Sequence, residues 1–324
     1  MDSFGRKVDY LRISITDRCN ERCLYCMPEG YKGWERTPDH LRAEEIVRVV
    51  WVAAELGFRK FRLTGGEPLV RHDILEIVQG MRKISGVDVI GLSTNGIKLA
   101  TLAKPLREAG VTAVNVSLDA LEPEIYKRVT GGNVDAVIAG IRAALAAGFE
   151  RVKLNCVLMR GVNEQEIWPL ALFAAEHNCP LRLIELMPLT RTDVLTEENF
   201  LPAGEVMQLL AQRDELVPQP DVKIGHGPAK YYLLKQTGAL VGFIGALTNL
   251  HFCEACNKMR LTADGKIRPC LGDHGEIDLR DILRTSEDDE ALRAVFLEAL
   301  RVKPLEHQFR GAYQPSRPMI AIGG

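Results

Sequence analysis

The sequence predicts an α/β protein, an incomplete (βα)6 TIM-like barrel followed by a smaller C-terminal α+β module. Short apolar, β-rich runs alternate with helical stretches six times. Such alternation is typical of a parallel sheet with right-handed crossovers. Beyond Pro218 the pattern changes to short alternating runs separated by glycine and proline. We therefore expect a barrel domain over 1–217 and a second module over 218–324.

The expected barrel strands are 11–15, 61–63, 87–92, 113–118, 152–158 and 181–186. A helix is expected at 41–56, where apolar side chains share one face, Glu45 lies largely off that face, and Gly57 ends the helix. In the C-terminal module, strands are expected at 231–234 and 240–244.

Charge and hydropathy exclude several classes of function. The 324 residues include 41 lysines and arginines against 43 acids, a formal charge of -2, so no global positive field attracts nucleic acid or an anionic membrane. The first ten residues are polar and charged, unlike a signal peptide, and no apolar run is long enough to cross a bilayer. We expect a cytoplasmic protein with no nucleic-acid or membrane partner.

Six of the eight cysteines form two triplets. The first, Cys19, Cys23 and Cys26, has the spacing C-x3-C-x2-C in a loop after the first strand. Three thiolates there can hold three corners of a four-iron cube and leave one iron open for a small molecule. The alternatives are a zinc knuckle or three packed cysteines.

Polar residues follow four of the expected strands, at 64–68, 93–96, 117–119 and 185–188. Each is an ordinary turn signal when taken alone. In a barrel these ends share one rim with the cysteine loop, so together they predict one site there. The paired glycines at 65 and 66 permit close approach of backbone to a ligand.

The second triplet, Cys253, Cys256 and Cys270, gives too many thiols for one cluster and predicts a second metal centre. A structural zinc site is the main alternative, because His251 or His274 could complete a Cys3His set. The two remaining cysteines, at 156 and 179, are interpreted as small buried hydrophobes.

The stretch from Cys19 to Cys26, with Tyr25 before its last cysteine, resembles the signature of the radical S-adenosylmethionine superfamily. The stretch 256–272 resembles one family of it, the GTP 3',8-cyclases or molybdenum cofactor biosynthesis protein A family, and the resemblance extends from about Arg12 to the terminal Gly323-Gly324. It implies two [4Fe-4S] clusters on the two triplets and S-adenosylmethionine as cosubstrate. The implied reaction converts GTP to (8S)-3',8-cyclo-7,8-dihydroguanosine 5'-triphosphate in molybdopterin synthesis.

The resemblance also assigns site residues. The S-adenosylmethionine pocket would be lined by Tyr25, Gly66, Ser117 and Met187. GTP would contact Arg12, Arg62, Ser93, Lys153, Lys258, Met259 and Arg260. The catalytic residues would be Arg12, Lys258, Arg260, Gly323 and Gly324. The family usually has arginine at the position of Lys258, so the charge is kept here while the bidentate fork is lost.

No G-x-x-x-x-G-K-[ST] segment occurs, so side-chain cations must hold the triphosphate. For Lys60 and Arg182, pairing with acids outside the barrel is as good an interpretation as a phosphate contact.

The implied partners are an electron donor of the flavodoxin or ferredoxin type and a downstream cyclic pyranopterin monophosphate synthase. The oligomeric state stays open, a homodimer included. Two alternative functions are another radical S-adenosylmethionine enzyme with an auxiliary cluster, such as one that modifies peptides, and a zinc-containing binding module on a barrel scaffold.

Overall fold

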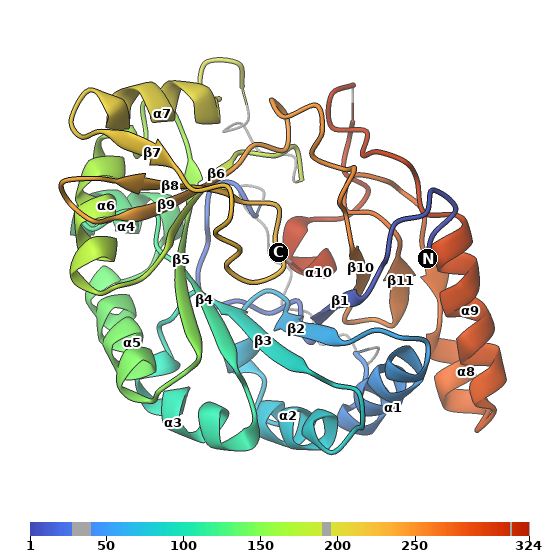
Figure 1. Ribbon diagram of the computed structural model, residues 1–324. Coiled ribbons are helices and arrows are strands. Elements are labelled where there is room, and N and C mark those ends of the chain that lie inside the picture. The colour runs from blue at the N-terminus through green and yellow to red at the C-terminus, as the bar shows by residue number, and fades with distance from the viewer. Residues whose placement is uncertain (28–39, 190–195, 312, 324) are drawn as a thin grey trace.

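A computed structural model describes residues 1–27, 40–189, 196–311 and 313–323. Its core is a curved sheet of six parallel strands in sequence order, which the ribbon in Figure 1 shows wrapped around the centre of the molecule. All six expected strands are present. They are β1 (Tyr10–Ser14), β2 (Lys60–Thr64), β3 (Val89–Thr94), β4 (Ala113–Ser117), β5 (Arg151–Leu158) and β6 (Leu181–Glu185).

Helices cover the outer face of this sheet (Figure 1). They are α1 (Ala43–Glu55), α2 (Ile74–Arg82), α3 (Leu99–Ala109), α4 (Pro123–Thr130), α5 (Val134–Ala146) and α6 (Ile167–Glu176), with short 3-10 turns η1 (Pro68–Val70) and η2 (Glu164–Glu166). The main core lies between the two layers, where side chains such as Ile46, Phe61 and Leu92 are buried. Strands rich in β-branched residues and amphipathic helices thus form the wall of the barrel.

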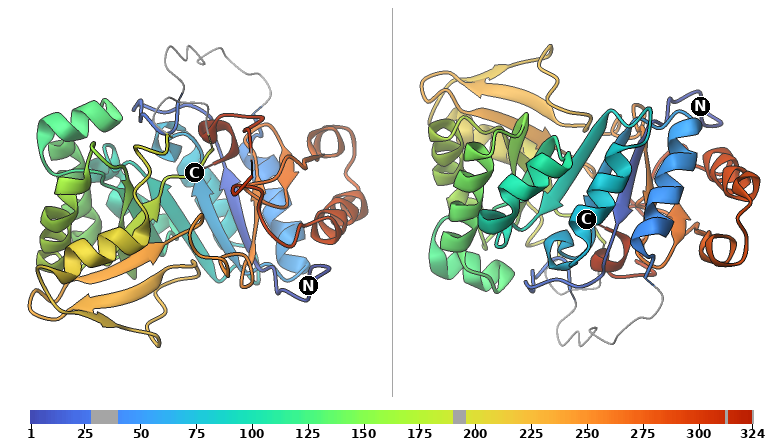
Figure 2. Two further views of the ribbon diagram at one scale, coloured as in Figure 1. Left: turned by 90° about the horizontal axis from the view of Figure 1, so that it is seen from above. Right: turned by 90° about the horizontal axis from the view of Figure 1, so that it is seen from below.

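Glu45, expected off the apolar face of the helix, is nevertheless buried. Its side chain is 3% exposed, accepts a hydrogen bond from the backbone N–H of Arg42 (2.7 Å) and pairs with Arg284 (3.2 Å). Arg284 belongs to α8 (Arg280–Thr285), which packs outside α1, as Figure 2 shows. Helix α8 therefore covers a face of α1 that the sequence pattern of α1 predicts to be polar.

The C-terminal strands extend the same sheet at both edges. Strand β9 (Leu240–Ile244) pairs parallel with β6, followed by antiparallel β8 (Lys230–Leu234) and β7 (Leu216–Pro218). At the other edge β10 (Lys258–Leu261) pairs parallel with β1, followed by antiparallel β11 (Lys266–Arg268) and β12 (Ile277–Asp278). The strands expected at 231–234 and 240–244 are confirmed, and the sheet has twelve strands in all.

The remaining helices are α7 (Ala203–Ala211), α9 (Asp289–Arg301), which packs with α8 beside α1, and α10 (Met319–Ile322). Figure 1 places α10 and the C-terminus at the centre of the barrel rather than on its outside. Within the described ranges, every helix is too short or too polar to span a membrane.

Two helix glycines differ in the space around them, and substitutions at both positions test how tightly the helices are packed. A Cβ on Gly140 of α5 would collide with the backbone oxygen of Gly96, whereas a Cβ on Gly204 of α7 would meet nothing within 4 Å. We expect Gly140→Ala to destabilise the apoprotein by about 1–3 kcal/mol because the backbone must move. Gly204→Ala should be neutral or stabilising by up to about 1 kcal/mol, because alanine favours the helix.

Urea unfolding followed by circular dichroism measures both free energies. Equal changes in the two variants would contradict the close contact between α5 and the loop after β3.

Candidate functional site

The loop that carries the first cysteine triplet is fixed by the segment after β2. The N–H of Gly66 donates to Thr16 O (2.8 Å) and the N–H of Glu67 to Arg18 O (2.7 Å). A Cβ on Gly66 would collide with the carbonyl oxygen of Arg18. From the sequence we expected the paired glycines to let the backbone come close to a ligand. In the structure they let the backbone come close to the cysteine loop itself.

The three thiols form a half-buried donor set at the carboxyl end of β1. Burial raises the pKa of Cys19 to about 12, and burial together with neighbouring negative charge raises the pKa of Cys23 and Cys26. Buried thiols of high pKa must lose protons when they ligate a metal. Three such thiols in one loop have the chemistry that a cluster with one open iron requires.

The polar strand ends meet beside this loop. The carboxylate of Glu67, 1% exposed, accepts from Thr94 Oγ1 (2.7 Å) and from the N–H of Asn95 (2.7 Å), so it ties the ends of β2 and β3 together. Asn95 Nδ2 then donates to Asn20 Oδ1 in the cysteine loop (2.8 Å). Burial raises the pKa of Glu67 to about 7, although its hydrogen bonds oppose the change.

The residues predicted for the cosubstrate lie at the same rim. Ser117 ends β4, Met187 follows β6 by two residues, and both are partly exposed. The hydroxyl of Tyr25 donates to Asp119 Oδ2 just after β4 (2.7 Å). The structure therefore brings together the cysteine loop and the strand ends that the sequence interpretation assigned to one site.

Two cysteines of the second triplet are brought together by a β-hairpin. Cys256 comes two residues before β10 and Cys270 two residues after the antiparallel β11, so the open end of the hairpin places them together. Burial raises the pKa of Cys253 and of Cys270. For Cys256 burial acts in the same direction, but the charge of Lys303, a backbone hydrogen bond from Lys258 and the charges of Lys258 and Arg6 together lower the pKa.

Both histidines of the zinc alternative have other partners. His251 is exposed and pairs with Glu254 (Nδ1 to Oε1, 2.6 Å), and the ring of His274 stacks on Tyr313 at 4.9 Å between centroids. Among the described residues, no three His, Cys, Asp or Glu side chains are placed to hold a single metal ion.

A row of arginines crosses three neighbouring strands between the two triplets. Arg12 of β1 lies opposite Arg260 of β10 and Arg62 of β2 in the strand register, so the three side chains point to one face. Arg62 Nε donates to Tyr10 Oη (2.5 Å) and Nη1 to Leu92 O (2.7 Å). A Cβ on Gly91 would lie 2.6 Å from Arg62 Nη2, so that glycine makes room for the guanidinium.

Further cations face the same interior. Lys153 is 2% exposed, and burial together with Arg182 and Arg62 lowers its pKa to about 6. Arg182 is also buried and donates to Asn155 Oδ1 from Nε (2.8 Å). Lys60 differs, because it forms an ion pair with Asp9 (2.8 Å).

Within the described ranges, these interior cations have no ion pair with an acid. They are Arg12, Arg62, Lys153, Arg182, Lys258 and Arg260. A buried charge without a partner is unfavourable, so this interior is suited to a polyanion.

Several groups of the barrel interior were not assigned from the sequence. Asn115 Oδ1 and Tyr231 Oη are among the buried polar atoms without a hydrogen-bond partner in the described residues, as is Nε of the predicted residue Arg12. The carbonyl of His226, in the loop between β7 and β8, accepts from Lys258 Nζ (3.0 Å), and a Cβ on neighbouring Gly225 would lie 2.6 Å from Lys153 Nζ. Glycines near this histidine are the only sequence signal for a loop that enters the barrel.

The C-terminal tail reaches the arginine row. The carbonyl of Gly323 accepts a hydrogen bond from Arg260 Nη1. A Cβ on Gly323 would lie 2.8 Å from Thr64 Cγ2 and 3.1 Å from Ser14 Cβ, so the tail passes directly over the ends of β1 and β2. Gly324, the other predicted tail residue, lies outside the described residues.

Ser93 of β3 lies opposite Asn115 in the strand register and is partly exposed, and Met259 of β10 is 1% exposed in the main core. Cys156 and Cys179 are buried, as predicted.

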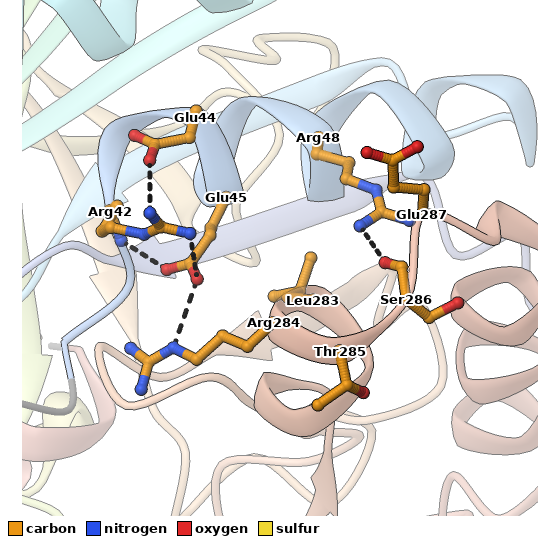
Figure 3. A pocket seen from close by; sticks show the side chains of 9 residues that line it. All are labelled: Arg42, Glu44, Glu45, Arg48, Leu283, Arg284, Thr285, Ser286 and Glu287. Atoms are coloured by element: carbon orange, nitrogen blue, oxygen red, sulfur yellow. Dashed lines mark hydrogen bonds and ion pairs between the residues drawn. The ribbon is translucent and has the colours of Figure 1, made fainter.

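A pocket of about 540 Å³ lies elsewhere, between α1 and α8 on the outside of the barrel (Figure 3). Its charged side chains neutralise one another: Arg42 pairs with Glu44 and Glu45, and Arg284 pairs with Glu45. It contains none of the predicted site residues.

Comparison with known proteins gives two family matches. Residues 13–174 match the radical SAM superfamily, and residues 179–309 match Molybdenum Cofactor Synthesis C. A GTP 3',8-cyclase of Pelotomaculum thermopropionicum is 46% identical, covering 100% of this chain and 99% of the relative. A GTP 3',8-cyclase of Moorella thermoacetica is 45% identical with the same coverage.

Among solved structures, Streptococcus suis SuiB bound to its precursor peptide SuiA has a TM-score of 0.62. It is 15% identical, and the match covers 95% of this chain and 67% of that one. At this identity the similarity concerns the fold alone.

The low pKa of Lys153 predicts how anion binding depends on pH. Near pH 7.5 this lysine is mostly neutral in the free protein, and a bound polyanion raises its pKa, so binding takes up a proton. The affinity for inorganic tripolyphosphate should therefore fall as pH rises above about 6, by up to about tenfold per pH unit from this group. Titration calorimetry between pH 6 and 9 measures it.

The variant Lys153→Met should bind tripolyphosphate more weakly, and its affinity should depend less on pH. Tripolyphosphate itself titrates equally in both experiments, so the difference between the two pH curves reports Lys153. Lys235→Met, at an exposed lysine paired with Glu215, should behave as wild type. Parallel pH curves for wild type and Lys153→Met would contradict the assignment.

Proposed function

The chain belongs to the GTP 3',8-cyclase family of the radical S-adenosylmethionine superfamily, and we propose that it joins C3' of GTP to C8 of guanine, giving (8S)-3',8-cyclo-7,8-dihydroguanosine 5'-triphosphate. The place of this reaction is molybdenum cofactor biosynthesis. One observation carries the assignment of the nucleotide site: the interior cations lie between two cysteine triplets without an acid partner in the described residues.

The family implies a [4Fe-4S] cluster and S-adenosylmethionine. We assign this cluster to Cys19, Cys23 and Cys26, whose thiols suit it by number, burial and position. When bound, it supplies the electron that cleaves the sulfonium of S-adenosylmethionine. We assign a second [4Fe-4S] cluster to Cys253, Cys256 and Cys270; the hairpin holds the last two together beside Lys258, and Cys253 lies three residues before Cys256.

The chain's own residues bind and orient the two small molecules. Arg260, Arg12 and Arg62 would neutralise the triphosphate as one row, because their planar forks suit phosphate oxygens. Lys258 would add charge beside the second triplet, although its ammonium also donates to the carbonyl of His226 and to Asn257 Oδ1 (2.9 Å). Lys153 gains a proton as the anion binds.

Other residues would hold the cosubstrate and exclude water. Gly66, Ser117 and Met187 are assigned to S-adenosylmethionine, with Tyr25 near its adenine. Gly323 lies close over Ser14 and Thr64, where a tail without side chains would help to cover the bound reactants. Exclusion of solvent protects a primary carbon radical from side reactions. Ser93 stays a proposed neighbour of the nucleotide. The side chain of Met259 is buried in the main core, on the face opposite to that of Lys258 and Arg260, so only its backbone would meet the nucleotide.

The division into a barrel domain over 1–217 and a second module over 218–324 is kept as a proposal. The chemistry also needs an electron donor, proposed as a flavodoxin or ferredoxin, and its product would pass to a cyclic pyranopterin monophosphate synthase.

The proposed reaction is tested by strictly anaerobic incubation with S-adenosylmethionine, a reductant and GTP deuterated at C3'. We expect deuterium in 5'-deoxyadenosine and a cyclised nucleotide that is an isomer of GTP. Cleavage of S-adenosylmethionine without any change in GTP would favour a peptide-modifying enzyme. The Arg62→Ala variant should lose cyclisation while cosubstrate cleavage remains, because Arg62 is assigned to the nucleotide alone.

Iron content tests the assignment of two clusters. Wild type should hold about eight irons with matching sulfide, and the variant with Cys253, Cys256 and Cys270 changed to alanine should lose about half of them. It should still cleave S-adenosylmethionine but form no cyclised product. One zinc per chain, or unchanged iron in the variant, would overturn the second cluster.

A further inference from the structure

Lys303, directly after α9, is a buried cation that the nucleotide site does not use. Its side chain is 2% exposed, and its ammonium donates to the carbonyls of Lys258 (2.8 Å) and Pro269 (2.7 Å). Within the described part of the chain, no acid forms an ion pair with it. A buried ammonium that meets only carbonyl dipoles lacks a counter-charge.

The two carbonyls that hold Lys303 belong to the second cysteine site. Lys258 lies two residues after Cys256, and Pro269 immediately precedes Cys270. Lys303 therefore bridges the start of β10 and the segment after β11, the two sides of the hairpin that bring these cysteines together. An ammonium has three N–H donors, and the two carbonyls use two of them, which leaves one for a sulfur atom.

The segment after Lys303 packs on the same site. A Cβ on Gly272, two residues after Cys270, would lie 2.8 Å from His307 Cβ and 2.7 Å from Phe309 Cε1. Arg6 joins this segment to the second triplet, because it donates to the carbonyls of Leu305 (2.6 Å) and Cys253 (3.1 Å). These contacts fix the position of Lys303 without any ligand.

We propose that Lys303 is the positioning residue and buried counter-charge of the second cluster, held by its two carbonyl contacts beside the cysteine ligands. The inference rests on the proposed second cluster. Three thiolates on a four-iron cube leave a net negative charge that grows on reduction, and a fixed ammonium stabilises the more negative state. Lys303 should thus raise the reduction potential of this cluster and its occupancy.

The test uses the full chain with Cys19, Cys23 and Cys26 changed to alanine, so that the second cluster is observed alone after anaerobic reconstitution. In this parent, Lys303→Met should shift the midpoint potential to a more negative value in an electron paramagnetic resonance titration and lower the iron per chain. Lys303→Arg keeps the charge and should recover most of both. Lys235→Met, far from the site, should match the parent.

Each contrary outcome has a distinct meaning. If the parent binds no iron, the second cluster fails and the inference fails with it. If the parent is loaded and Lys303→Met shows the same potential and iron content, the inference alone is wrong. With all six ligand cysteines present, Lys303→Met should still cleave S-adenosylmethionine at the first cluster. Loss of that reaction would show a role in the whole fold and would overturn the local assignment.

Discussion

The structure depends on one electrostatic constraint: the barrel interior holds several buried cations and has no acid paired with them in the described residues. The strand register sets this up, because Arg260, Arg12 and Arg62 occupy equivalent positions on three adjacent strands. Burial and repulsion from neighbouring cations lower the pKa of Lys153 to about 6. A further positive charge is therefore unfavourable in this interior when no anion is bound. A bound polyanion would relieve the repulsion and so stabilise the folded protein.

The row of arginines also requires that the C-terminal strand β10 belong to the barrel sheet. Were β10 in a separate sheet, Arg260 would not lie opposite Arg12, and the second cysteine triplet would not adjoin the row. Parallel pairing of β10 with β1 places Arg260 in the same row as Arg12 and brings the second triplet, which is far from the first in sequence, next to this row. The tail then reaches the row through the hydrogen bond between Arg260 and Gly323.

The sequence predicted the features that depend on local pattern. Six strands, the first helix and both cysteine triplets follow from periodicity and spacing, which a single chain segment determines. Features that depend on pairing between distant segments were missed: the pairing of β10 with β1, the burial of Glu45 under α8, and the carbonyl contacts of Lys303. The glycine at position 66 was recognised as a close-approach residue, but its neighbour is Arg18, a contact that only the folded chain creates.

The ionisable groups near the two cysteine triplets differ, carboxyl groups at the first and lysines at the second, and this difference would favour ligands of opposite sign at the two places. Buried carboxyl groups of Glu21, Glu67 and Asp119 surround the first cysteine loop, whereas Lys303 and Lys258 act on the second triplet. A sulfonium cosubstrate is a cation and a nucleoside triphosphate is a polyanion, so each is favoured at a different end. Binding in the reverse arrangement would bury the triphosphate among carboxyl groups. Under the proposed function, these groups would thus favour the triphosphate near the second triplet and the sulfonium near the first.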